Sequence, residues 1–166
     1  MESKAKLLGH PIHQMLIVFP LGLLATGVVF DIVRLATDAV LFGEVAYWMI
    51  IAGLIGGALA APFGLVDWLA IPAGTRAKRI GALHGLGNVV VLVLFLISAI
   101  LRSDIPADPP QSAYVCSFAG AILSLLTAWL GGELVDRLGI GVYSNAGVDA
   151  PSSLRHEPRT GRPLKA

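Results

Sequence analysis

Four long apolar stretches are the feature that most restricts how this 166-residue chain can fold. They cover approximately residues 11–35, 45–71, 80–101 and 112–134. A bilayer core is about 30 Å thick, and a helix that crosses it needs roughly 20 apolar residues. Each stretch reaches that length, so the sequence predicts an all-α fold, an integral membrane four-helix bundle.

Composition excludes several other classes of protein. Hydrophobic residues make up 55% of the chain and charged residues 14%, against roughly 45–50% and about 25% in soluble domains. A soluble domain this small could not bury so much apolar surface. The net charge of +1 gives no support for nucleic-acid binding. The single cysteine, Cys116, excludes an internal disulfide and any site built from several cysteines.

The basic residues are divided unequally between the two sides of the predicted bundle. Arg34 and Arg102 lie on one side. The other 10 of the 12 lie on the side of both termini: Lys4, Lys6, Arg76, Lys78, Arg79, Arg137, Arg155, Arg159, Arg162 and Lys165. Basic residues are enriched on the cytoplasmic side of membrane proteins, so we expect cytoplasmic N- and C-termini.

We expect three parts along the chain. Residues 1–10 form a cytoplasmic N-terminal segment, and residues 11–141 form the domain of four transmembrane helices. Residues 142–166 are rich in Pro, Ser, Gly and Arg, a composition typical of a disordered, basic cytoplasmic tail.

A short repeat suggests that the domain consists of two similar helical hairpins. The triplet Leu-Val-Asp ends both the second span, at Asp67, and the fourth, at Asp136. The same offset of 69 residues places His84 of the third span close to His13 of the first. Both hairpins would start on the cytoplasmic side, as parallel repeats do. Chance similarity is the alternative for so short a match.

Small residues recur at four-residue spacing in two of the spans, which favours close packing between helices. The alternative interpretation is that these rows of small residues line a groove for a ligand. The rows are Gly53-Gly57-Ala61 and Gly56-Ala60-Gly64 in the second span, and Gly120-Ser124-Ala128-Gly132 in the fourth. Pro20 and Pro62 each remove a backbone donor and should kink or loosen their helices.

Polar and ionisable side chains gather near the cytoplasmic end of the spans, and such residues are by default functional candidates. The candidate cofactor ligands are His13, His84 and Asn88. The candidate metal ligands are His10, His13, Asp67 and His84. Imidazoles suit haem iron, zinc and copper, and a carboxylate can orient an imidazole from outside the coordination sphere.

Each of these residues also has a structural interpretation. His10 lies beside a helix start at Pro11, and Asn88 suits a hydrogen bond between helices. Asp67 could pair with Arg76 or Arg79 instead of an imidazole. Glu133 and Asp136 suit headgroup contacts or Arg137, and Asp31 with Arg34 suits a structural pair at the outer end of the first span.

Three runs of sequence resemble a known family. They are Gly9-His10-Pro11-Ile12-His13 with Phe19-Pro20-Leu21 and Asp31, then Gly64, Asp67 and residues 79–88, then Gly131-Gly132-Glu133-Leu134-Val135 with Gly139-Ile140-Gly141-Val142. Over about residues 7–143 the chain is similar to domain-of-unknown-function family 2231, bacterial four-span membrane proteins. The resemblance implies the bacterial inner membrane and no established activity. Some relatives join this module to a Rieske-type iron–sulphur domain, which implies electron transfer with a separate partner, because this chain lacks the cysteines.

The sequence therefore supports three hypotheses of function. The first is a redox module that binds haem b or a transition metal at the cytoplasmic-side histidines. The second is a small transporter or proton-relay protein, and the third is an accessory scaffold subunit of a membrane complex. Expected partners are the lipid bilayer and a separate redox or membrane-complex partner, with a homo-oligomer as a further option and no nucleic acid.

Overall fold

The computed structural model describes residues 1–154, and four helical segments within them are long and apolar enough to cross a membrane. They cover Ile12–Thr37, Leu41–Ala70, Arg76–Leu101 and Gln111–Arg137. Their most apolar windows have mean hydropathies of 1.8 to 2.3. Each segment corresponds to one predicted stretch, which confirms the helical membrane fold.

The first membrane segment is interrupted near its start. Helix α1 (Ile12–Leu16) and helix α2 (Val18–Thr37) are separated by Ile17. Pro20 has no N–H to donate to the carbonyl of Leu16, so the helical bond that would join the two pieces cannot form. The expected disturbance at Pro20 is therefore present, whereas α3 (Leu41–Ala70) continues through Pro62.

The second hairpin has clear local signals at its ends. Helix α4 (Arg76–Leu101) begins at Thr75, whose side chain accepts a hydrogen bond from the backbone N–H of Lys78. Helix α5 (Gln111–Gly132) follows Pro110. It continues as a π-helical turn, η1 (Glu133–Arg137), in which the wider backbone spiral accommodates an extra residue.

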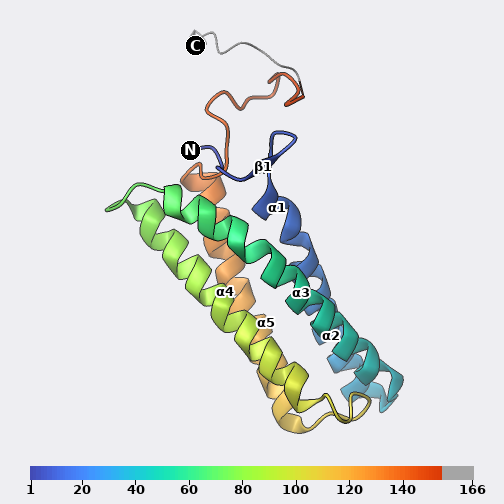
Figure 1. The fold of residues 1–166 in the computed structure, drawn as a ribbon. Coiled ribbons are helices and arrows are strands. Elements are labelled where there is room, and N and C mark those ends of the chain that lie inside the picture. Colours follow the sequence, from blue (N-terminus) through green and yellow to red (C-terminus); the bar gives the residue numbers. More distant parts are fainter. Residues whose placement is uncertain (155–166) are drawn as a thin grey trace.

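The helices form two antiparallel hairpins, with α2 along α3 and α4 along α5 (Figure 1). Contacts of α3 with α4 and of α2 with α5 close the bundle, so α2 and α4 lie diagonally across it. One end of the bundle, which we call the N-terminal end, carries the N-terminal segment, the α3–α4 connection and η1 (Figure 1). The opposite end, which we call the far end, carries the α2–α3 and α4–α5 connections.

The middle of the bundle is an apolar core. Its buried members are Leu24, Ile50, Val91, Phe95 and Ala99. Outside this core, large apolar side chains such as Leu125 and Trp129 remain exposed, with 72% and 66% of their surface accessible. A bilayer accommodates such an outer surface, because lipid tails are as apolar as the side chains.

The small residues of α3 allow the close approach that their spacing predicts. A Cβ added at Gly53 would lie 2.6 Å from Leu24, and one at Gly57 would lie 2.6 Å from Leu92. The row in the fourth span does not continue in this way, because Gly132 has open space around it. Gly120 packs on Phe95 and Gly131 packs on His84, so the packed face of α5 passes through Gly131 instead.

The N-terminal segment contains a small hairpin that sequence patterns did not reveal. Strand β1 (Lys6–Leu7) pairs antiparallel with β2 (His10–Pro11). The two residues between them, Leu8 and Gly9, have φ values of 49° and 85°. Positive φ values at both residues are characteristic of the type I′ turn, one of the two common two-residue hairpin turns. Of the predicted tail, residues 142–154 are described, and residues 155–166 lie outside the described part.

Candidate functional site

His13 stands on the short helix α1 and lies against α3. Its Nδ1 atom is 3.0 Å from the carbonyl oxygen of Ala60. The ring also lies on Gly64, where a Cβ would come within 2.8 Å of the imidazole. The glycine one turn beyond the bonded carbonyl therefore makes room for the ring on the surface of α3.

His84 has the same kind of environment in the other hairpin. Its Nδ1 atom is 2.9 Å from the carbonyl oxygen of Thr127 in α5, and its ring lies on Gly131. As in the first hairpin, the glycine follows the bonded carbonyl by four residues. This equivalence supports the two-hairpin interpretation with contacts that the Leu-Val-Asp match did not include.

The two imidazoles meet across the bundle. His13 comes from the first hairpin and His84 from the diagonally opposed helix α4, and their ring centroids are 6.4 Å apart. The ring planes are almost perpendicular, at 85°. The structure thus brings together the two histidines that the sequence placed at equivalent positions.

Hydrogen bonding determines the protonation pattern that these rings favour. A carbonyl oxygen can only accept, so Nδ1 of each neutral imidazole must carry the proton. Nε2 then holds the lone pair, and a ring oriented in this way is the usual form of a histidine ligand. The pair therefore offers two unprotonated Nε2 atoms, on half-buried rings, as possible ligand atoms.

Asn88 supports His84 without occupying this lone pair. Its amide nitrogen donates to the carbonyl oxygen of His84 at 2.8 Å, and its Oδ1 accepts from the hydroxyl of Thr127 at 3.0 Å. The same nitrogen is 3.3 Å from Nε2 and 3.5 Å from Nδ1 of His84. An atom almost equally distant from both ring nitrogens cannot lie along the lone pair of Nε2.

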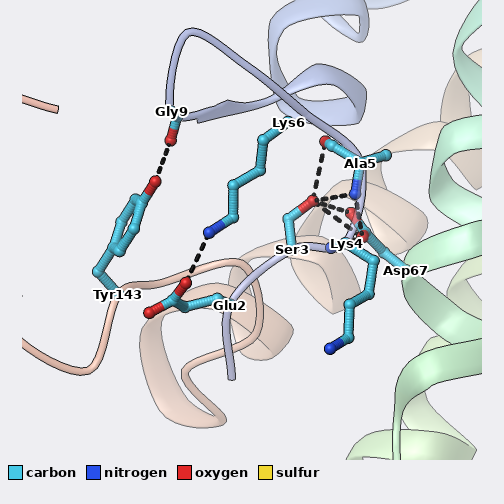
Figure 2. Close-up of polar contacts among 8 residues, drawn as sticks. All are labelled: Glu2, Ser3, Lys4, Ala5, Lys6, Gly9, Asp67 and Tyr143. Carbon is cyan, nitrogen blue, oxygen red and sulfur yellow. Dashed lines mark hydrogen bonds and ion pairs between the residues drawn. The ribbon is translucent and has the colours of Figure 1, made fainter. Parts of the chain in front are cut away.

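Asp67 lies with the N-terminal segment (Figure 2). Its carboxylate accepts from the hydroxyl of Ser3 at 2.7 and 2.8 Å and from the backbone N–H of Lys4 at 2.7 Å. A longer contact of 3.4 Å comes from the N–H of Ala5. Asp67 therefore anchors the start of the chain to α3, a role that residue spacing could not reveal.

Other contacts tie the same segment to the end of the bundle. The hydroxyl of Tyr143 donates to the carbonyl oxygen of Gly9 at 2.6 Å, and Lys6 lies over the Tyr143 ring. Lys6 also donates to Glu2 at 2.6 Å, and this hydrogen bond raises the pKa of Lys6 above its usual value (Figure 2). The N-terminal hairpin is thus a structured part of the molecule.

His10 is exposed on β2, and its Nε2 atom lies 3.4 Å from the hydroxyl of Ser153. Across residues 1–154, no three His, Cys, Asp or Glu side chains are grouped closely enough to hold a metal ion. The structure therefore unites His13, His84 and Asn88, and it leaves His10 and Asp67 in separate environments. Nearby, Glu133 forms an ion pair with Arg76 rather than with Arg137.

A second polar cluster, at the far end, was missed by sequence reasoning. Asp31 of α2 forms a fully buried ion pair with Arg102, at 2.8 Å, and not with Arg34. Ser117 of α5 donates to the same carboxylate at 2.8 Å. Arg34 instead binds Asp108 at 2.8 Å. A buried aspartate needs a partner of this kind. The sequence did not identify Arg102 as that partner, because Arg102 lies at the end of an apolar stretch, where an arginine is expected to be exposed in a loop.

Comparison with known proteins identifies a family and nothing finer. The sequence model of a family described as "Predicted membrane protein (DUF2231)" matches residues 9–144. Neither a curated protein nor a solved structure matches the chain.

Proposed function

This chain belongs to the DUF2231 family of predicted membrane proteins, and we propose that it is a membrane-embedded haem-binding redox module. His13 and His84 are the proposed axial ligands. The observation that carries the proposal is the meeting of two imidazoles inside the bundle, each held by a main-chain carbonyl.

The distance between the rings fits two ligands on one iron. A metal-bound imidazole nitrogen lies about 2 Å from the ion. In a ring with bonds of about 1.33 Å, the centre lies about 1 Å behind that nitrogen. Two imidazoles on opposite sides of one ion therefore have centroids about 6 Å apart, and the observed separation is 6.4 Å.

The number of donors favours haem over a bare metal ion. A protein site for zinc normally needs at least three protein ligands, and the described residues group no three such side chains. A haem requires only axial ligands from the protein, because its macrocycle supplies the others. When bound, it would supply one-electron transfer.

The chain's own residues have clear tasks in this proposal. The carbonyl oxygens of Ala60 and Thr127 hold the Nδ1 protons and keep each Nε2 available. Asn88 lies against the His84 ring and donates to the His84 carbonyl oxygen, which favours this position of the side chain. Gly64 and Gly131 leave space for the rings beside their neighbouring helices.

A transporter or proton relay across the membrane has less support. Such a path needs polar groups along its length, but the histidine pair is followed toward the far end by the apolar core around Leu24, Ile50 and Phe95. A redox module needs no such path. The accessory-scaffold hypothesis has no particular observation in its favour.

We also infer a bacterial inner-membrane location with cytoplasmic termini. The two basic residues of the far end, Arg34 and Arg102, are 9% and 0% exposed and bind carboxylates. The exposed basic residues of the described chain therefore gather at the N-terminal end, as the positive-inside rule requires of a cytoplasmic face. Electron transfer there implies a separate redox partner on that side.

The test is haem binding by the full chain purified in detergent. We expect the protein, after expression with haem supply or titration with haemin, to show the visible spectrum of low-spin haem at one haem per chain. His84→Ala should lose that spectrum almost completely, and His13→Ala should lose most of it.

His10→Ala is the matched control, because the His10 imidazole is exposed on β2 and lies outside the pair. It should retain the wild-type spectrum. Elemental analysis for iron, zinc and copper accompanies each spectrum. A colourless wild type that haemin does not change would refute the proposal, and so would equal loss in the His10 and His84 variants.

A further inference from the structure

A groove at the far end of the bundle combines apolar walls with two polar side chains. It has a volume of about 480 Å³ and is lined by Leu35, Pro109, Gln111, Tyr114, Val115 and Phe118. That volume is within the range of about 300–1,000 Å³ that is typical of small-molecule sites. The lining comes from α2, α5 and the connection before α5, at the end opposite the histidine pair.

Tyr114 is the polar group that most needs an explanation. Its side chain is only 7% exposed, yet its hydroxyl has no hydrogen-bond partner among residues 1–154. No fully buried polar side-chain atom in that range lacks a partner, so the hydroxyl keeps some accessible surface, and Tyr114 lines the groove. A tyrosine hydroxyl in largely apolar surroundings normally finds a partner, and an occupant of the groove can supply one.

The charges beside the groove disfavour an anionic occupant. Arg102 lies 5.6 Å from the Tyr114 ring, but its guanidinium is already bound to Asp31. Arg34 is likewise bound to Asp108 and to the carbonyl oxygen of Ala107. The basic groups are therefore neutralised, and a phosphate or carboxylate would meet no free cation there.

We propose that this groove binds a neutral, lipid-soluble carbonyl compound of the quinone class. The Tyr114 hydroxyl donates to one carbonyl oxygen of the compound, and the Gln111 amide lies one helical turn earlier on the same wall. Phe118 and Pro109 offer flat apolar surfaces to a ring, and Leu35 and Val115, both more than half exposed, lead outward to the lipid. This inference does not depend on haem binding at the histidine pair.

The test is binding of decylubiquinone to the full chain in dodecyl maltoside, measured by isothermal titration calorimetry. We expect saturable binding at one molecule per chain. Tyr114→Phe should weaken it about three- to tenfold, the effect expected when one neutral hydrogen bond is lost. Val115→Trp should abolish it, because the indole fills the groove from an exposed position.

Tyr47→Phe is the matched control, since it removes a hydroxyl from α3 without touching the groove. It should bind decylubiquinone as the wild type does, and circular dichroism should show all variants folded. The proposal fails if Tyr114→Phe and Val115→Trp both bind like the wild type. It also fails if phosphatidylglycerol binds the wild type and excludes decylubiquinone, because the occupant is then an anionic lipid.

Discussion

At the scale of single residues, the buried ion pair between Asp31 and Arg102 has hydrogen-bond partners on both sides. Both side chains are completely buried, and the guanidinium contacts both carboxylate oxygens. It also donates to the backbone and hydroxyl oxygens of Ser98. Ser117 donates to the carboxylate from a third helix. The pair joins α2 to the end of α4 and so connects the two hairpins.

Removing one member of this pair should be costly, because the other charge would remain buried without a partner. We expect Asp31→Leu or Arg102→Met to lower the free energy of unfolding by about 3–5 kcal/mol. Thermal or denaturant unfolding in detergent measures the effect.

The double variant Asp31→Leu with Arg102→Met distinguishes charge burial from simple disruption of packing. It should be more stable than either single variant, because no unpaired charge remains. Ser98 and Ser117 keep hydrogen-bond partners in the carbonyl oxygens of Ala113 and Tyr114. Additive losses in the double variant would contradict this interpretation of the pair.

At the scale of the helices, contacts at the glycines decide how closely the elements approach. Gly43 at the start of α3 faces the backbone of the α4–α5 connection, where a Cβ would lie 2.6 Å from the carbonyl oxygen of Ala107. Gly57 in mid-helix faces Leu92 of α4. Four-residue spacing identified Gly57 but not Gly43, because the contact of Gly43 is with a loop.

We therefore expect Gly57→Leu and Gly43→Ala each to lower the free energy of unfolding by about 1–3 kcal/mol, the scale of overpacking. Gly132→Leu is the control, since Gly132 has open space around it. It should change stability little, although the spacing in the fourth span suggested a packing seam there. Equal losses at positions 57 and 132 would count against the packed faces described above.

At the scale of the whole molecule, the bundle has two unlike ends. The N-terminal end carries the histidine pair and the anchored N-terminal segment, and the far end carries the buried ion pair and the groove. The apolar core separates them. Proposals for the two ends can therefore be tested separately.

The proposed orientation can be measured directly in intact cells. In a Cys116→Ala background, we expect an impermeant thiol reagent to label Gln111→Cys from outside. A reporter protein that folds only in the cytoplasm should be active when it is fused after residue 166. A reporter that folds only outside the cytoplasm should be inactive there. Labelling of position 111 only after the membrane is made permeable would reverse the assignment.

Much of the architecture followed from local sequence. A helix must satisfy its own backbone hydrogen bonds in lipid, so length and hydropathy alone locate each span. The break at Pro20 followed from the missing N–H, and the end of the bundle at which His13, His84 and Asn88 lie followed from counting spans. These properties depend on residues close together in the chain, which is why they could be predicted.

Only the tertiary structure decided which polar groups meet. Whether the imidazole of His13 faces His84 depends on how each helix is rotated and on which helices lie diagonally. Asp67 binds Ser3, and Asp31 binds Arg102, because folding brings segments far apart in the chain together. Several partners were compatible with the spacing of each residue, and only the arrangement of the segments in the folded chain distinguishes them.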